Sequence, residues 1–159
     1  MLRAILITLM MFAAAPASAG KFDDARAAYN QGDYSTAFRL FRELAEQGNR
    51  SALYILGVMY DNGKGLPQDY AEAAKWYRLA AEQGIAEAQT NLGLMYDEGS
   101  GVSQDNITAH MWYNIGSANG KALGGENRDK LAENMTPADI SEAQRRARVC
   151  MNSNYQDCD

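Results

Sequence analysis

The sequence is poor in the residues that catalysis and metal binding usually require. Its 159 residues include one histidine, His110, and two cysteines, Cys150 and Cys158. A structural zinc site takes four nitrogen or sulfur ligands, and His110 is far from the cysteines in the sequence. The motif S-x-x-K does not occur after residue 19, nor does K-T-G, so the signatures of penicillin-recognising serine enzymes are missing. We predict no catalytic residue, no metal and no cofactor.

Positive charge is also scarce. The formal net charge is −5, and loss of Arg3 with the N-terminal segment would lower it to −6. The charges are spread along the chain and form no basic stripe, whereas binding to phosphate backbones requires clustered Lys and Arg. We therefore expect no nucleic-acid partner.

A long apolar run occurs only at the N-terminus. Arg3 precedes an apolar stretch at residues 4–15, and Ala17-Ser18-Ala19 forms a small-residue cleavage site, the layout of a signal peptide. The stretch is shorter than the roughly 20 residues of a membrane-spanning helix. We predict a signal peptide at residues 1–19, cleaved after Ala19, and a periplasmic or secreted mature chain without an integral membrane segment. Residues 20–159 suffice for one domain.

The two cysteines lie close together near the C-terminus. In an exported protein such a pair predicts a disulfide between Cys150 and Cys158. Closing this short loop would contribute roughly 2 to 3 kcal/mol in the chain-entropy model. Metal binding is the alternative.

A pattern of 36 residues occurs twice between residues 49 and 120. A repeat of this length predicts stacked helical hairpins, and hence an all-α, α/α superhelical solenoid. Fourteen positions are identical between the two copies: Ala52/Ala88, Leu56/Leu92, Gly57/Gly93, Met59/Met95, Tyr60/Tyr96, Asp61/Asp97, Gly63/Gly99, Gly65/Gly101, Gln68/Gln104, Asp69/Asp105, Ala73/Ala109, Trp76/Trp112, Tyr77/Tyr113 and Gly84/Gly120.

The repeat divides the mature chain into four parts. Residues 20–48 form a shortened first hairpin, 49–84 and 85–120 are full repeats, and 121–159 provide capping helices and the disulfide-closed tail. Within the last part, helices are expected at 126–135 and from Thr136 onward, where a hydroxyl cap precedes Pro137. We expect Trp76 and Trp112 to fill the space beside the small residues Gly57 and Gly93.

These motifs resemble the Sel-one-like repeat (SLR) family, a relative of the tetratricopeptide repeat. The resemblance rests on A-x-x-x-L-G-x-M-Y, the turn G-x-G, then Q-D and A-x-x-W-Y, in residues 49–84 and 85–120. Residues 20–48 look more like a tetratricopeptide unit, because the G-x-G turn is missing. The family implies binding to proteins or peptides, or an adaptor role. Some exported, cysteine-rich relatives bind or hydrolyse β-lactams, but they carry one cysteine pair per repeat, whereas here both cysteines lie in the tail.

A stripe beside the expected core of each first helix is the candidate binding surface. In the related tetratricopeptide fold the first helices line the concave side, so the stripes of successive repeats would form a groove with apolar anchors and acidic ends. The stripe residues, at helical spacing, are Ser51, Tyr54, Val58 and Asp61 in one repeat and Glu87, Thr90, Leu94 and Asp97 in the next. The alternative interpretation is that these residues are ordinary solenoid surface or pack against a neighbouring hairpin.

The leading hypothesis is a non-enzymatic exported module that binds a peptide segment of another envelope protein in this groove. The acidic residues would favour a basic partner. The alternative is a protein that binds or weakly hydrolyses β-lactams or cell-wall fragments, with His110 as a base; a partly exposed helix residue is the plainer reading of His110. Self-association through the same face is a third possibility.

Overall fold

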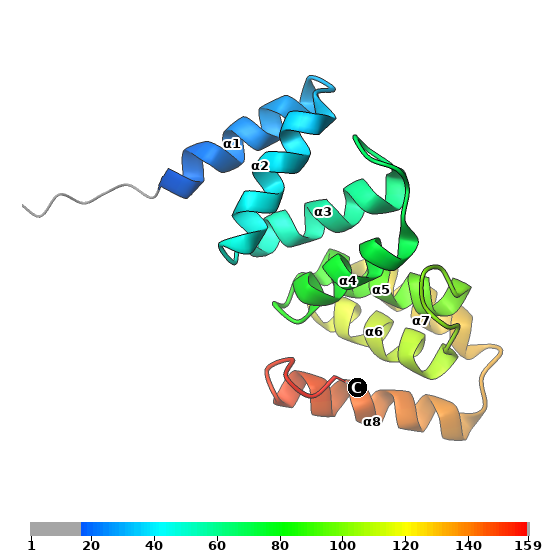
Figure 1. Cartoon of the computed structure of the whole chain (residues 1–159). Helices are drawn as coiled ribbons and strands as arrows, with labels where there is room; N and C mark the ends of the chain where they lie inside the picture. The colour runs from blue at the N-terminus through cyan, green and yellow to red at the C-terminus, as the bar shows by residue number, and fades with distance from the viewer. Residues whose placement is uncertain (1–16, 159) are drawn as a thin grey trace, which may run out of the picture.

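The computed structural model describes residues 17–158, and in this range the chain forms eight α-helices and no strand (Figure 1). This confirms the predicted all-α solenoid of helical hairpins. Most of the predicted signal peptide lies outside the described residues. The helices are α1 (Ala17–Asn30), α2 (Tyr34–Glu46), α3 (Arg50–Asn62), α4 (Tyr70–Ala81), α5 (Ala86–Glu98), α6 (Asn106–Ala118), α7 (Ala122–Ala132) and α8 (Pro137–Asn152).

The helices pack in the order of a solenoid. Each of the pairs α1–α2, α3–α4 and α5–α6 forms a hairpin, and the second helix of each hairpin packs against the first helix that follows it. At the C-terminal end, α7 and α8 both pack against α6, and Figure 1 shows α8 running beneath α6. The last two helices thus cover α6 from two sides.

Glycines at equivalent positions end the second helix of each hairpin. Gly84 has φ +78°, its N–H donates to Ala81 O (2.9 Å), and the N–H of Ile85 donates to Ala80 O (3.2 Å). These two bonds form a Schellman motif, which needs a left-handed residue at the glycine position. Gly48 and Gly120 also have positive φ. The same glycine position of the repeat therefore ends three helices with a left-handed residue.

The residues that fill the space beside the small glycines are tyrosines, so the prediction for the tryptophans is wrong. A Cβ added to Gly57 would lie 2.5 Å from Cδ1 of Tyr77, and one added to Gly93 would lie 2.6 Å from Cδ1 of Tyr113. Tyr77 follows Trp76 directly, and neighbouring residues on a helix point about 100° apart. The helix is therefore turned so that the tyrosine, and not the tryptophan, faces the preceding helix.

The helix predicted at 126–135 begins earlier, at Ala122. Gly124 and Gly125 disfavour a helix by propensity, which hid its start. Packing explains the first glycine: a Cβ at Gly124 would lie 2.8 Å from Tyr113 O. The close approach of α7 to α6 therefore depends on Gly124, the residue whose low helix propensity concealed the start of α7.

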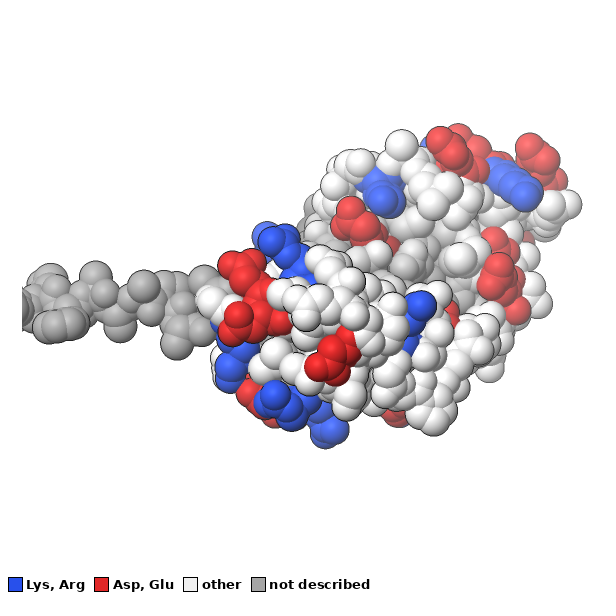
Figure 2. All heavy atoms as spheres, turned by 90° about the horizontal axis from the view of Figure 1, so that it is seen from above, with Lys and Arg blue, Asp and Glu red and all other residues white. Residues whose placement is uncertain are grey.

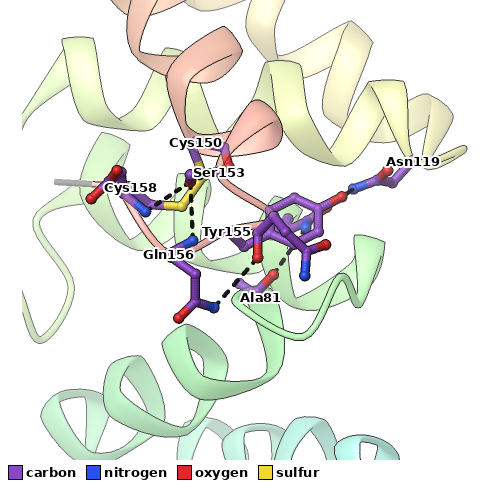
Figure 3. Close-up of a disulfide and its surroundings, with 10 residues drawn as sticks. Ala81, Asn119, Cys150, Ser153, Tyr155, Gln156 and Cys158 are labelled. Carbon is purple, nitrogen blue, oxygen red and sulfur yellow. Dashed lines mark hydrogen bonds between the residues drawn. A yellow bond between two sulfur atoms is a disulfide. The ribbon is translucent and has the colours of Figure 1, made fainter.

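The C-terminal tail is closed by the predicted disulfide between Cys150 and Cys158 (Figure 3). It folds back over the ends of α4 and α6. Asn119 donates to the hydroxyl of Tyr155 (2.8 Å), and the Tyr155 ring lies against Gly84. The tail thus connects the last helix to two earlier hairpins.

Candidate functional site

An apolar cavity of about 230 Å³ lies between α1, α2 and α3. Two predicted groove residues of α3, Tyr54 and Val58, belong to its wall. Helices α1 and α2 are held together beside it by edge-on ring pairs, Phe22 with Phe41 at 5.6 Å and Tyr29 with Tyr34 at 5.1 Å between centroids. The complete lining is Arg26, Tyr29, Phe41, Tyr54, Ile55 and Val58.

A second cavity of about 250 Å³ lies between α5, α6 and α7. Two predicted groove residues of α5, Leu94 and Asp97, line it, and Leu94 is 39% exposed. This cavity is more polar than the first, since its lining holds two carboxylates and one ammonium group. The lining residues are Leu94, Asp97, Glu98, Tyr113, Asn127, Lys130, Leu131 and Asn134.

The two cavities follow one another along the same side of the solenoid. Val58 lines the first and Leu94 lines the second, and these residues occupy equivalent positions 36 residues apart. Both lie on first helices of their hairpins. The repeat thus presents an apolar side chain at a regular interval beside two separate hollows.

Tyrosine–aspartate pairs repeat along this side. The hydroxyl of Tyr77 donates to Asp61 Oδ2 (3.0 Å), and the hydroxyl of Tyr113 donates to Asp97 Oδ2 (3.1 Å). Burial, followed by the charge of the paired aspartate, raises the pKa of both tyrosines well above the usual value. The hydroxyls therefore stay protonated and hold the carboxylates in place.

An asparagine from the next helix joins each pair. Asn91 of α5 interacts with the Tyr77 hydroxyl and Asn127 of α7 with the Tyr113 hydroxyl, and each lowers the tyrosine pKa, against the effects of burial and the aspartate. Asn91 also interacts with Tyr54, whose pKa is raised by burial and then by Glu87. Asn91 and Asn127 are themselves 36 residues apart. The polar network therefore occurs in both full repeats and links each of them to the helix that follows.

Four predicted groove residues line neither cavity: Asp61, which Tyr77 holds, and Thr90, Ser51 and Glu87. Thr90 is only 2% exposed, and its hydroxyl donates to Ala86 O (3.0 Å), so it cannot belong to an open surface. Its repeat position is crowded because Gly116 and Gly124 bring α6 and α7 close to it. Ser51 is exposed near the start of α3, and Glu87 forms an ion pair with Lys121 (3.8 Å).

The second-helix tyrosines were not among the predicted site residues. Tyr77 and Tyr113 were noted only as identical positions of the repeat, yet their hydroxyls hold the two aspartates. The sequence did contain a signal for this network. The same residue types recur 36 residues after Asp61, Tyr77 and Asn91. Phe41 of the first cavity lies 36 residues before Tyr77, but the α1 residues Arg26 and Tyr29 carry no such signal, because the turn after α1 is shortened.

The single histidine is buried, which corrects the expectation of a partly exposed residue. His110 is 2% exposed, and burial, followed by the charge of Arg128, lowers its pKa. A side chain so enclosed is poorly placed to take a proton from a substrate at the surface. Within residues 17–158, no group of three His, Cys, Asp or Glu side chains is arranged to hold a metal ion. None of the helices in that range is both long and apolar enough to cross a membrane.

Comparisons with known proteins agree with this architecture. The Sel1 repeat sequence model matches residues 25–49, 50–85 and 86–121, so it includes the short first hairpin that lacks the glycine turn. No curated protein matches the sequence. The chain is similar to a solved Sel1 repeat protein from Oxalobacter formigenes, with 30% identity and a TM-score of 0.66 over 72% of this chain and 89% of that one.

A second solved structure is a protective antigen present in uropathogenic Escherichia coli strains, described as displaying an SLR fold. It shares 28% identity with a TM-score of 0.80 over 87% of this chain. The aligned part is 31% of the antigen, so the chain spans about a third of that protein. Three matched repeats over most of the sequence and the stacked hairpins lead to one conclusion: this chain belongs to the Sel1 repeat family.

Proposed function

We propose that this protein is an exported interaction module that binds a peptide segment of another envelope protein along the side formed by α1, α3, α5 and α7. Sel1 repeats build a protein-interaction fold, and that coarser assignment follows from the family. The observation that carries the proposal is the pair of cavities, one lined by Tyr54 and Val58 and the next by Leu94 and Asp97. An extended segment could place one apolar side chain in each.

The charges beside the cavities favour a partner with basic residues. The carboxylates of Asp97 and Glu98 line the second cavity against the single ammonium of Lys130. Asp61 is the repeat equivalent of Asp97, and Tyr77 holds its carboxylate. On the face seen in Figure 2, acidic and basic side chains are interspersed. Electrostatic attraction of a basic segment would therefore be local and should weaken as salt increases.

Export is supported by two features of the chain. The N-terminal 19 residues have the layout of a signal peptide. The disulfide between Cys150 and Cys158 is of the kind that persists in oxidising compartments. Helix α1 begins at Ala17, so cleavage after Ala19 would remove only its first residues.

A crosslinking pull-down from the native envelope tests the groove. The wild type is compared with a Tyr54→Ala/Leu94→Ala variant, which removes an anchor from each cavity. A Tyr70→Ala/Val149→Ala variant is the matched control, because both residues are exposed and apolar, line neither cavity and belong to α4 and α8, outside the proposed binding side. We expect specific partners to be lost from the first variant and kept by the control. An identical partner list for all three proteins would contradict the proposal.

A further inference from the structure

A third cavity, of about 460 Å³, lies on another side of the molecule, between α4, α5 and the turn before α6. From α5 it is lined by Leu92 and Tyr96, which point nearly opposite to the groove residues Leu94 and Asp97 by helical geometry. It is therefore separate from the two hollows of the groove. Its lining consists of Ala71, Ala74, Lys75, Arg78, Leu79, Leu92, Tyr96, Gly101 and Val102.

The position equivalent to Ala74 carries a ring in both neighbouring repeats. Ala74 corresponds to Phe38 one repeat earlier and to His110 one repeat later. Phe38 packs edge-on against Tyr60, with 5.6 Å between centroids and 81° between the ring planes. Tyr60 is in turn the repeat equivalent of Tyr96. The chain thus shows how an aromatic ring fits at this position.

The middle hairpin, α3–α4, has no ring at this position. Ala74 carries one methyl group, and the tyrosine that would meet the ring instead contacts the guanidinium of Arg78, with 5.9 Å from Cζ to the centroid of Tyr96. The cavity remains at the position where the repeat has its smallest side chain. Around it, Leu79 is 45% exposed, so an apolar rim faces solvent.

We propose that this cavity binds an aromatic side chain of a partner protein. The ring would pack against Tyr96 as Phe38 packs against Tyr60, an arrangement that aromatic pairs favour. Both cations of the lining already have partners, because Lys75 forms an ion pair with Glu72 and Arg78 donates to the hydroxyl of Tyr96. The site would therefore recognise the ring itself and not a charge beside it. The site goes beyond the groove proposed above and does not depend on it.

Titration of the mature, disulfide-bonded protein by amide NMR tests the site. The probes are the neutral amides of N-acetyl-phenylalanine and N-acetyl-leucine. We expect saturable shifts at Ala71, Gly101 and Val102, with the phenylalanine probe binding several-fold more tightly than the leucine probe. Absence of saturable shifts there, or equal binding of the leucine probe, would overturn the proposal.

Filling the cavity from inside provides the matched variant. Ala74→Phe restores the ring found in the preceding repeat and should abolish the shifts while the helical circular dichroism is kept. If that variant does not fold, Ala74→Leu fills part of the same space and should weaken binding at least several-fold. Unchanged binding in a folded variant would show that the probe sits elsewhere.

The reciprocal substitution should create a second site. Phe38→Ala opens the equivalent space beside Tyr60. We expect new saturable shifts around Tyr60 with the same preference for the phenylalanine probe. Shifts confined to the original cavity in the folded variant would contradict the repeat equivalence. Light scattering checks the oligomeric state. If the wild type is a dimer and Ala74→Phe is a monomer, the cavity is filled by a second copy of this chain, and the proposal of a different partner protein is overturned.

Discussion

The hairpins α3–α4 and α5–α6 are near copies in sequence but differ in burial. Trp112 is fully buried, whereas its repeat equivalent Trp76 is partly exposed. Ala74 borders an open cavity, whereas its equivalent His110 is enclosed. The first-helix glycines and their tyrosines, in contrast, pack alike in both hairpins. Contacts within a hairpin are thus copied with the repeat, while contacts on its outer side depend on what covers it.

The covering element explains the difference. Helix α4 packs mainly against α3 and α5, whereas α6 packs against α5, α7 and α8. Ala143, Ala147 and Cys150 of α8 are completely buried. The second full repeat therefore lies in the closed end of the solenoid, and the first full repeat keeps an outer surface open.

The largest effect should separate the two tryptophans. Trp112→Ala should cost about 3 to 5 kcal/mol of unfolding free energy, since a fully buried indole is lost, and Trp76→Ala about 2 kcal/mol. Urea unfolding of the two variants and the wild type measures both values. Equal losses would mean that the extra helix on α6 does not determine the burial of this position.

Removing the disulfide should loosen the closed end selectively. We expect Cys150→Ser/Cys158→Ser to lose about 2 to 3 kcal/mol, because the unfolded chain regains the freedom of the loop. Hydrogen exchange should accelerate in α8 and in the tail around Tyr155, while α3 retains its protection. A uniform acceleration over all helices would contradict a cap that acts locally.

Most of the fold could be predicted from the sequence because its signals are local and repeated. Gly48, Gly84 and Gly120 mark helix ends through a backbone conformation that other residues resist, and the structure has positive φ at all three. The start of α7 was missed for the opposite reason. Gly124 is unfavourable in a helix, and only its contact with Tyr113 O explains it.

The candidate site was predicted less completely, because it depends on how the hairpins are rotated against each other. Tyr54, Val58, Leu94 and Asp97 line the two cavities, but Thr90, chosen by the same spacing, is buried under α6 and α7. The repeat period predicts which residues share one face of a helix, but it does not predict which other helix covers that face. The larger outer cavity could not be expected either, since it results from a missing side chain.

The tyrosine–aspartate pairs should respond alike in the two hairpins. Tyr77→Phe and Tyr113→Phe each remove the hydroxyl that donates to an aspartate. We expect each variant to lose about 1.5 to 2 kcal/mol of unfolding free energy, the lower part of the range for a hydrogen bond to a charged acceptor. Urea unfolding measures this, and the ring contact with Gly57 or Gly93 is kept as an internal control. A loss in only one hairpin would show that these pairs, too, depend on the covering helix.

The smallest effect should be a pH dependence that only the second hairpin shows. Burial and then Arg128 lower the pKa of His110 below its usual 6.5, while Asp129 acts in the opposite direction. The folded state thus favours the neutral ring, so its contribution to stability is complete above about pH 6.5 and is lost as the pH falls toward the folded-state pKa. Urea midpoints between pH 7.5 and pH 5.5 should fall for the wild type and fall less for His110→Gln. Glu142, whose pKa Arg145 and Arg146 lower to about 2, does not titrate in this window. Equal slopes for the two proteins would contradict a neutral, enclosed His110, and with it the difference between this position and Ala74.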